Sequence, residues 1–169
     1  MNKILKAWPF LLVVTSVSIP MHAQPRPEKT IDSLQVELER AKAVAKHFEE
    51  NYHRVLYLFT AKEMALRSHE ISDPNLRGLV SVQAQKFQRD YNGDPRDPEI
   101  YQALFSALTK LDSSAASDFP PSTTAPDYDS SKGKLIAKKI CSYQNRNLLA
   151  TEWERLVGDH LPYESTCPY

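Results

Sequence analysis

Apolar residues recur at alternating steps of three and four positions between about Thr30 and Ile71. No proline or glycine interrupts this stretch, so the pattern predicts one long helix with a heptad seam of apolar side chains. The seam consists of Leu34, Leu38, Ala41, Ala45, Phe48, Tyr52, Val55, Phe59 and Leu66. Lys62 is the one polar residue in this register.

Two interpretations of the long helix stay open. In the first, the helix packs on the helices that follow it. In the second, two copies pair through the seam as a parallel homodimer, although Ala41, Ala45 and Lys62 weaken such a core. The candidate interaction residues on this helix are Leu34, Leu38, Phe48, Tyr52, Val55 and Phe59.

Two shorter amphipathic helices are predicted next, each beginning at an aspartate followed by a proline. Asp73 and Asp97 can accept hydrogen bonds from free helical N–H groups, and a proline suits the first turn. The apolar stripes are Leu76, Leu79, Val80, Ala84, Phe87 and Tyr91, and then Ile100, Tyr101, Leu104, Phe105, Leu108 and Leu111. The turn at Asn92-Gly93-Asp94-Pro95 is short, so we expect a helical hairpin.

The remainder of the chain is predicted to be a linker and a short tail. Residues 113–131 contain few large apolar side chains and should form a flexible linker. A helix over 132–143, with Leu135, Ile136 and Ile140 on one side, and a helix over about 148–157 follow, before an irregular end. The expected fold is therefore all-α, with a helical domain over 24–112 and a separate helical tail over 132–169.

The first 23 residues have the layout of a secretory signal peptide. Lys3 and Lys6 precede an apolar run from Ala7 to Ile19, and Ala23 offers a small residue for cleavage. The apolar run is shorter than the roughly 18–20 residues that span a bilayer. We therefore expect export to the periplasm or cell envelope, with an uncleaved membrane segment as the alternative.

The chain contains two cysteines, Cys141 and Cys167. An oxidising compartment favours a disulfide between them, which would stabilise the short C-terminal segment. The alternative is two free thiols, with Cys141 buried in a helix and Cys167 in the tail.

Composition and motifs point away from catalysis and nucleic-acid binding. The formal net charge is zero and no basic face is visible, so nothing favours phosphate contacts. The sequence has no G-x-S-x-G elbow and no phosphate-binding glycine loop. His47, Glu50 and His53 share one helix face, but a di-iron site needs further ligands on facing helices. We expect no enzyme activity, no cofactor and no metal site.

Two segments resemble parts of a family of bacterial WD-repeat proteins. Residues 61–111 resemble the helical region that precedes the β-propeller in that family. The matching residues are Ala61, Lys62, Met64, Ala65, Arg67, Ser68, Asp73, Pro74, Leu76, Gln83, Ala84, Phe87, Tyr91, Gly93, Asp97, Ile100, Tyr101, Ala103, Leu104, Ala107 and Leu108. Relatives often have caspase-like or NTPase modules, or a membrane helix, further upstream.

Residues 141–169 resemble the tail that follows the last propeller blade in the same family. The matching residues are Cys141, Arg146, Asn147, Leu148, Glu152, Trp153, Val157, Gly158, Pro162, Tyr163, Thr166, Cys167 and Pro168. Leu149 stands where the family has a capping threonine and Thr151 where it has an acid, so Asn147 or Thr151 should supply the helix cap. The propeller itself is absent, and only the predicted linker lies between the two segments.

The leading functional hypothesis is a non-catalytic module for protein interaction or assembly. Its partner is another protein or a second copy, bound through the heptad seam or through an aromatic tail surface that includes Trp153 and Tyr163. The alternative for these two aromatic residues is packing against the helix over 132–143. The alternative for the whole chain is a propeller-less remnant of a WD-repeat protein with no independent function, and a metal-binding helical protein is a weaker one.

Overall fold

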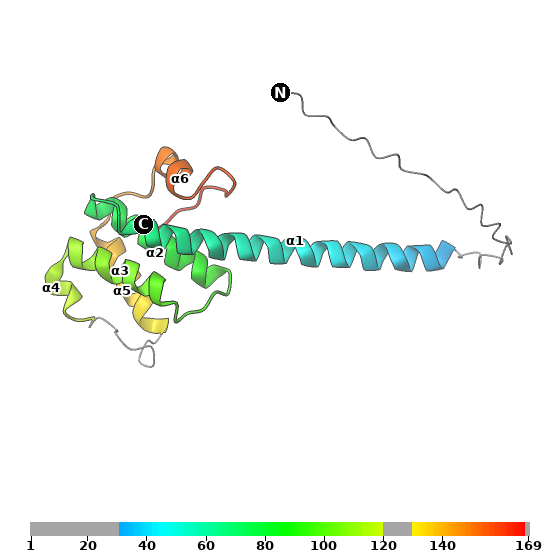
Figure 1. The fold of residues 1–169 in the computed structure, drawn as a ribbon, viewed down its shortest axis with the longest axis horizontal. Helices are drawn as coiled ribbons and strands as arrows, with labels where there is room; N and C mark the ends of the chain where they lie inside the picture. The colour runs from blue at the N-terminus through cyan, green and yellow to red at the C-terminus, as the bar shows by residue number, and fades with distance from the viewer. Residues whose placement is uncertain (1–30, 120–129, 168–169) are drawn as a thin grey trace, which may run out of the picture. The chain divides into compact units, whose positions relative to one another are not determined.

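The computed structural model describes residues 31–119 and 130–167, and its regular elements in these ranges are all α-helices (Figure 1). They are α1 (Ile31–Ser68), α2 (Pro74–Asp90), α3 (Pro98–Leu111), α4 (Ser113–Ala116), α5 (Ser130–Tyr143) and α6 (Ala150–Leu156). The all-α fold, the long first helix and the helical hairpin are confirmed. The proposed signal segment, residues 1–23, lies outside the described residues.

The chain divides into two units within α1, after Arg40. The described part of the first unit is the helical stretch from Ile31 to Arg40. The second unit begins at Ala41 and includes all later helices. None of the described helices is long and apolar enough to cross a membrane.

The two Asp-Pro sequences begin α2 and α3 as predicted. The Asp73 carboxylate accepts a hydrogen bond from the backbone N–H of Asn75 at 3.0 Å. The Asp97 carboxylate accepts hydrogen bonds from the N–H groups of Glu99 at 3.0 Å and Ile100 at 3.4 Å. These bonds satisfy helical donors that lack partners within the helix.

The hydrophobic core lies where α2, α3 and α5 pack against one another, and the end of α1 and the C-terminal segment also contribute to it (Figure 1). Most residues of the predicted stripes on α2 and α3 are buried. The largest fully buried apolar side chains are Phe87, Met64, Leu79, Leu104, Leu108, Ile136, Ile140 and Leu148. On α5, Leu135 is exposed and does not share the buried side of Ile136 and Ile140, so that part of the prediction is wrong.

The predicted linker and the separate tail domain need correction. Residues Ser113–Ala116 form α4, because the Asp112 carboxylate accepts hydrogen bonds from the N–H groups of Ser114 and Ala115. The same carboxylate accepts the Tyr143 hydroxyl at 2.6 Å, which joins the end of α3 to the end of α5. Residues 120–129 of the predicted linker lie outside the described residues.

The C-terminal segment belongs to the same core as the hairpin and forms no separate domain. Ile140, Leu148, Trp153 and Cys167 are all members of one cluster of buried residues that also contains the core of α2 and α3. A disulfide joins Cys141 on α5 to Cys167, so the favoured cysteine pairing is confirmed.

Removal of this disulfide should lower the free energy of unfolding but leave the helical core folded. The two cysteines are 26 residues apart in sequence, and a cross-link over such a loop contributes about 3–4 kcal/mol on the chain-entropy model. Urea unfolding of Cys141→Ser/Cys167→Ser should show this loss. The wild-type protein in reductant is the control and should unfold at the same midpoint as the variant. Equal stability of the variant and the oxidised wild type would contradict the prediction.

Candidate functional site

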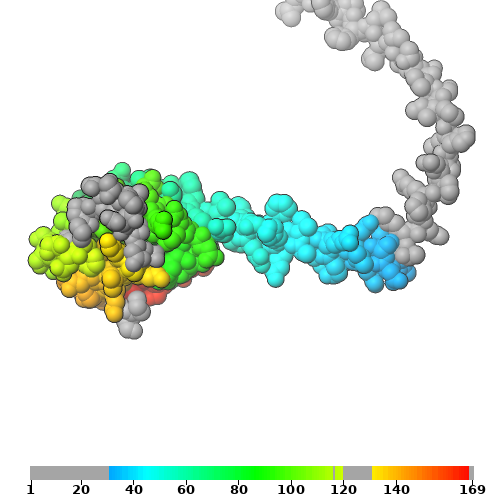
Figure 2. Space-filling model, turned by 90° about the horizontal axis from the view of Figure 1, so that it is seen from below, coloured from blue at the N-terminus to red at the C-terminus, as the bar shows by residue number. Residues whose placement is uncertain are grey.

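The predicted seam faces solvent along α1. In the first unit, Leu34 and Leu38 are 50% and 54% exposed. In the second unit, Phe48, Tyr52, Val55 and Phe59 are 61–69% exposed. On the face shown in Figure 2, no green, yellow or orange segment covers the cyan part of α1. Phe48, Tyr52, Val55 and Phe59 are therefore not part of the core, and the packing on later helices that the first interpretation predicts is made by another face of α1.

A different face of α1 attaches it to the core. The buried residues of α1 are Tyr57, Thr60, Ala61, Met64, Ala65 and Ser68. The Tyr57 ring stacks on Tyr91 at a centroid distance of 3.7 Å and meets Phe87 edge-on at 4.9 Å. The guanidinium of Arg54 donates hydrogen bonds to the backbone carbonyls of Tyr91 and Asn92, both at 3.2 Å.

Lys62, the polar residue in the seam, fixes α1 to the start of α3. Its ammonium lies 3.2 Å from carboxylate oxygens of both Asp97 and Glu99. The pKa of Lys62 is raised, first by the hydrogen bond with Asp97 and then by that with Glu99. Asp97 is buried, so this ion pair is more shielded from water than an ordinary surface pair.

The C-terminal part of the exposed seam borders a groove of about 480 Å³. One wall consists of Val55, Leu58, Phe59 and Lys62 on α1. The other wall comes from α2, the turn after it and the start of α3, with Gln88, Gly93, Asp94, Asp97 and Pro98. Gly93 allows this close approach, because a Cβ atom there would lie 2.6 Å from Leu58 Cδ2 and 2.5 Å from Gln88 Cδ.

Trp153 is buried, so its proposed role in docking is wrong. Its ring meets Phe87 of α2 edge-on at 6.0 Å, and its Nε1–H donates to the Leu161 carbonyl at 3.1 Å. Tyr163 is 52% exposed, but its hydroxyl donates to the Leu148 carbonyl at 2.7 Å. The two rings lie 5.2 Å apart, so both residues hold the tail against the body of the protein.

The cap of α6 comes from neither Asn147 nor Thr151. The Glu152 carboxylate accepts the N–H of Leu149 at 2.8 Å and binds both terminal nitrogens of Arg146, at 2.6 and 2.9 Å. Asn147 instead fixes the tail, because its Oδ1 accepts the N–H groups of Thr166 and Cys167.

The tail also bonds directly to α2. The Thr166 hydroxyl donates to Gln83 Oε1 at 2.8 Å, and Lys86 forms an ion pair with Glu164 at 2.8 Å. Sequence reasoning missed these contacts, because they join residues about 80 positions apart.

The histidine face of α1 forms no metal site in the structure. His47 Nε2 is 2.9 Å from Asn51 Nδ2, and Glu50 lies 3.8 Å from Lys46 Nζ. The His53 ring meets Tyr52 edge-on at 5.9 Å. Among residues 31–119 and 130–167, no three His, Cys, Asp or Glu side chains are grouped so that they could hold a metal ion.

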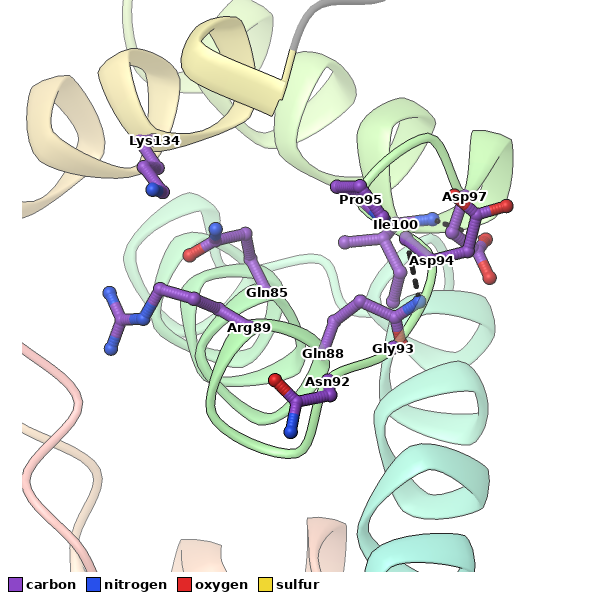
Figure 3. A pocket seen from close by; sticks show the side chains of 10 residues that line it. All are labelled: Gln85, Gln88, Arg89, Asn92, Gly93, Asp94, Pro95, Asp97, Ile100 and Lys134. Atoms are coloured by element: carbon purple, nitrogen blue, oxygen red, sulfur yellow. Dashed lines mark hydrogen bonds between the residues drawn. The ribbon is translucent and has the colours of Figure 1, made fainter.

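Two further recesses border α2. The smaller, about 180 Å³, lies beside the α2–α3 turn and is lined by Gln85, Arg89, Asp94, Lys134 and other residues (Figure 3). The larger, about 670 Å³, runs between α2 and α5 and includes Lys134 and Lys138. The hydroxyls that line the larger recess donate hydrogen bonds within the protein, Ser142 to the Lys139 carbonyl, Ser165 to the Cys167 carbonyl and Thr166 to Gln83 Oε1.

No protein-family model matches the chain, and no match is found among the curated proteins or the solved structures.

The Arg146–Glu152 pair gives the tail a pH-dependent stability. The hydrogen bond from Arg146 holds the pKa of Glu152 below its usual value. The contribution of Glu152 is thus present above its unfolded pKa and is lost as the pH falls through the folded pKa. Glu152→Gln should lower the free energy of unfolding by about 1–2 kcal/mol at neutral pH.

Urea unfolding over a range of pH checks this expectation. The difference between wild type and Glu152→Gln should shrink as the pH falls below about 4. Glu154→Gln, on the same helix but exposed, is the matched control and should change stability little. A difference independent of pH, or an equal loss in the control, would show that the ion pair does not stabilise the tail.

Proposed function

We propose that this protein is a non-catalytic assembly module that binds a partner helix through the exposed heptad face of α1. The binding surface consists of the a and d positions Ala41, Ala45, Phe48, Tyr52, Val55 and Phe59, and Leu34 and Leu38 occupy further positions of the same register.

The main support is the exposure of four large apolar side chains in succession on one side of a helix. Phe48, Tyr52, Val55 and Phe59 are each more than 60% exposed, although the same helix has a second face that is buried in the core. Complete burial of such a side chain contributes roughly 1.5–3 kcal/mol. Contiguous apolar patches of this kind mark interaction sites on soluble proteins.

Export to the periplasm or cell envelope is part of the proposal. The layout of the first 23 residues supports it, and so does the disulfide between Cys141 and Cys167, since disulfides persist in oxidising compartments.

The relation to WD-repeat proteins is also proposed, as a short form that lacks the propeller. Its support is that the two segments that resemble the family contact each other. Gln83 and Lys86 belong to the first segment, and they bind Thr166 and Glu164 of the second. A chain whose remaining segments complete one core favours a working short form over a remnant without function.

Site-specific photo-cross-linking in the native cell tests the proposed binding surface. A benzophenone-containing phenylalanine derivative replaces Tyr52 on the seam or Glu50 on the opposite side of α1. Both positions are exposed, so neither change disturbs the core. We expect a discrete adduct of higher mass from position 52 and none from position 50, because only the seam contacts a partner.

The absence of an adduct at position 52, or equal adducts at both positions, would show that the seam binds no specific partner. Phe48→Glu provides a second measurement. When it is combined with the photoreactive residue at position 52, it should abolish the adduct. Val36→Glu, an exposed apolar residue on α1 outside the seam, should leave it unchanged.

A further inference from the structure

We infer that the partner helix is α1 of a second copy of this chain, and that the two helices run antiparallel. Ala45 of each copy then faces Phe48 of the other, and Ala41 faces Tyr52. This inference rests on the proposed function, because it names the occupant of the same apolar face.

The first argument is the order of side-chain sizes along the seam. In the second unit the successive seam positions are two alanines, Ala41 (d) and Ala45 (a), and then two aromatic residues, Phe48 (d) and Tyr52 (a). An antiparallel pair places a positions opposite d positions, so a small residue can meet a large one in each layer. The four central layers then all contain one alanine and one aromatic ring, which allows a uniform distance between the helices.

A parallel pair in register lacks this match. It sets Ala41 against Ala41 and Ala45 against Ala45, and then Phe48 against Phe48 and Tyr52 against Tyr52. Two layers of small side chains would be followed by two layers of large ones. Because the distance between packed helices depends on the side chains at the contact, no single distance would suit all four layers. The same two alanines that weaken a parallel dimer therefore favour an antiparallel one.

The second argument is the charge at the positions that flank the seam. In an antiparallel pair the e positions of the two helices face each other, and here Lys42 and Glu49 are e positions. The register defined above brings Lys42 of each copy beside Glu49 of the other, which gives two opposite-charge contacts by symmetry. Both residues are exposed on α1, so they are positioned for contacts across a dimer.

The adjacent antiparallel registers are disfavoured by the same two residues. A shift of one heptad in one direction sets Glu49 against Glu49, and a shift in the other direction sets Lys42 against Lys42. Like charges that face each other across a helix pair are repulsive. Size and charge thus select one register independently.

Cysteine cross-linking distinguishes the orientations directly. In the proposed dimer, position 41 faces position 52 of the other copy, whereas the two copies of position 41 are about 16 Å apart along the axis. A mixture of Ala41→Cys and Tyr52→Cys should therefore form a mixed disulfide dimer under mild oxidation, and neither variant alone should do so. Peptide mass mapping confirms that Cys141 and Cys167 remain joined.

Charge reversal provides a second measurement that does not require new cysteines. Lys42→Glu and Glu49→Lys should each raise the dissociation constant of the dimer by about tenfold, measured by sedimentation equilibrium. The double variant Lys42→Glu/Glu49→Lys should restore wild-type affinity, because the pairs reform with exchanged charges. Circular dichroism of each variant checks that the fold is unchanged.

The outcomes separate this inference from the proposed function. Efficient cross-linking of Ala41→Cys with itself, or no rescue in the double variant, would overturn the antiparallel register. If the protein is monomeric at all concentrations and the photo-adduct at position 52 contains a different protein, the partner is not a second copy. The proposed function would still stand. A monomer with no adduct would overturn both.

Discussion

The packing of Tyr57, Ala61, Met64 and Ala65 against the later helices determines which side of α1 is left outside. These residues fix one face of the last three turns of α1 in the core. With 3.6 residues per turn, Phe48, Tyr52 and Val55 lie on the opposite side of the same helix, and they are exposed. The exposed apolar face is therefore a consequence of how α1 is anchored, and it needs no separate structural element.

The body that anchors α1 depends equally on its C-terminal segment. Trp153 and Cys167 lie in the same core as Phe87, and the disulfide fixes the end of the chain to α5. The N-cap residue of α6, Leu149, has no polar side chain. The Glu152 carboxylate, which is paired with Arg146, instead accepts the Leu149 N–H. A small helical domain with few core layers gains stability from such links.

Local rules were enough to predict much of this fold. The sequences Asp73-Pro74 and Asp97-Pro98 predict helix starts, because each aspartate can accept backbone N–H groups of the helix it begins. The stripes on α2 and α3 consist mainly of large apolar residues on one side of each helix. The anchoring face of α1 was not visible in the same way. It contains Ala61, Ala65 and Ser68, whose small side chains add little to an apolar pattern but allow close approach. Periodicity identified the larger apolar face and could not show that this face stays outside.

The packing of the C-terminal segment into the core is not predictable from the sequence for a related reason. Its association with α2 depends on contacts of Gln83 and Lys86 with residues at the far end of the chain, and no local pattern encodes them. The aromatic content around Trp153 is evident in the sequence, but composition does not reveal whether a ring faces a core or a partner. The same limit applies to Leu149 and Glu152, since a cap supplied by the third helical residue is less evident than one supplied by a threonine at the N-cap position.

Hydrogen exchange of the backbone amides between Ala41 and Phe59, measured on the wild-type protein at low and high concentration, tests the central claim most directly. If the exposed face of α1 pairs with a second copy, these amides exchange quickly in dilute solution and become protected as the concentration rises, while the amides of α2 and α3 remain unchanged. If the exchange of the Ala41–Phe59 amides is the same at all concentrations, the apolar face of α1 is not a self-association surface.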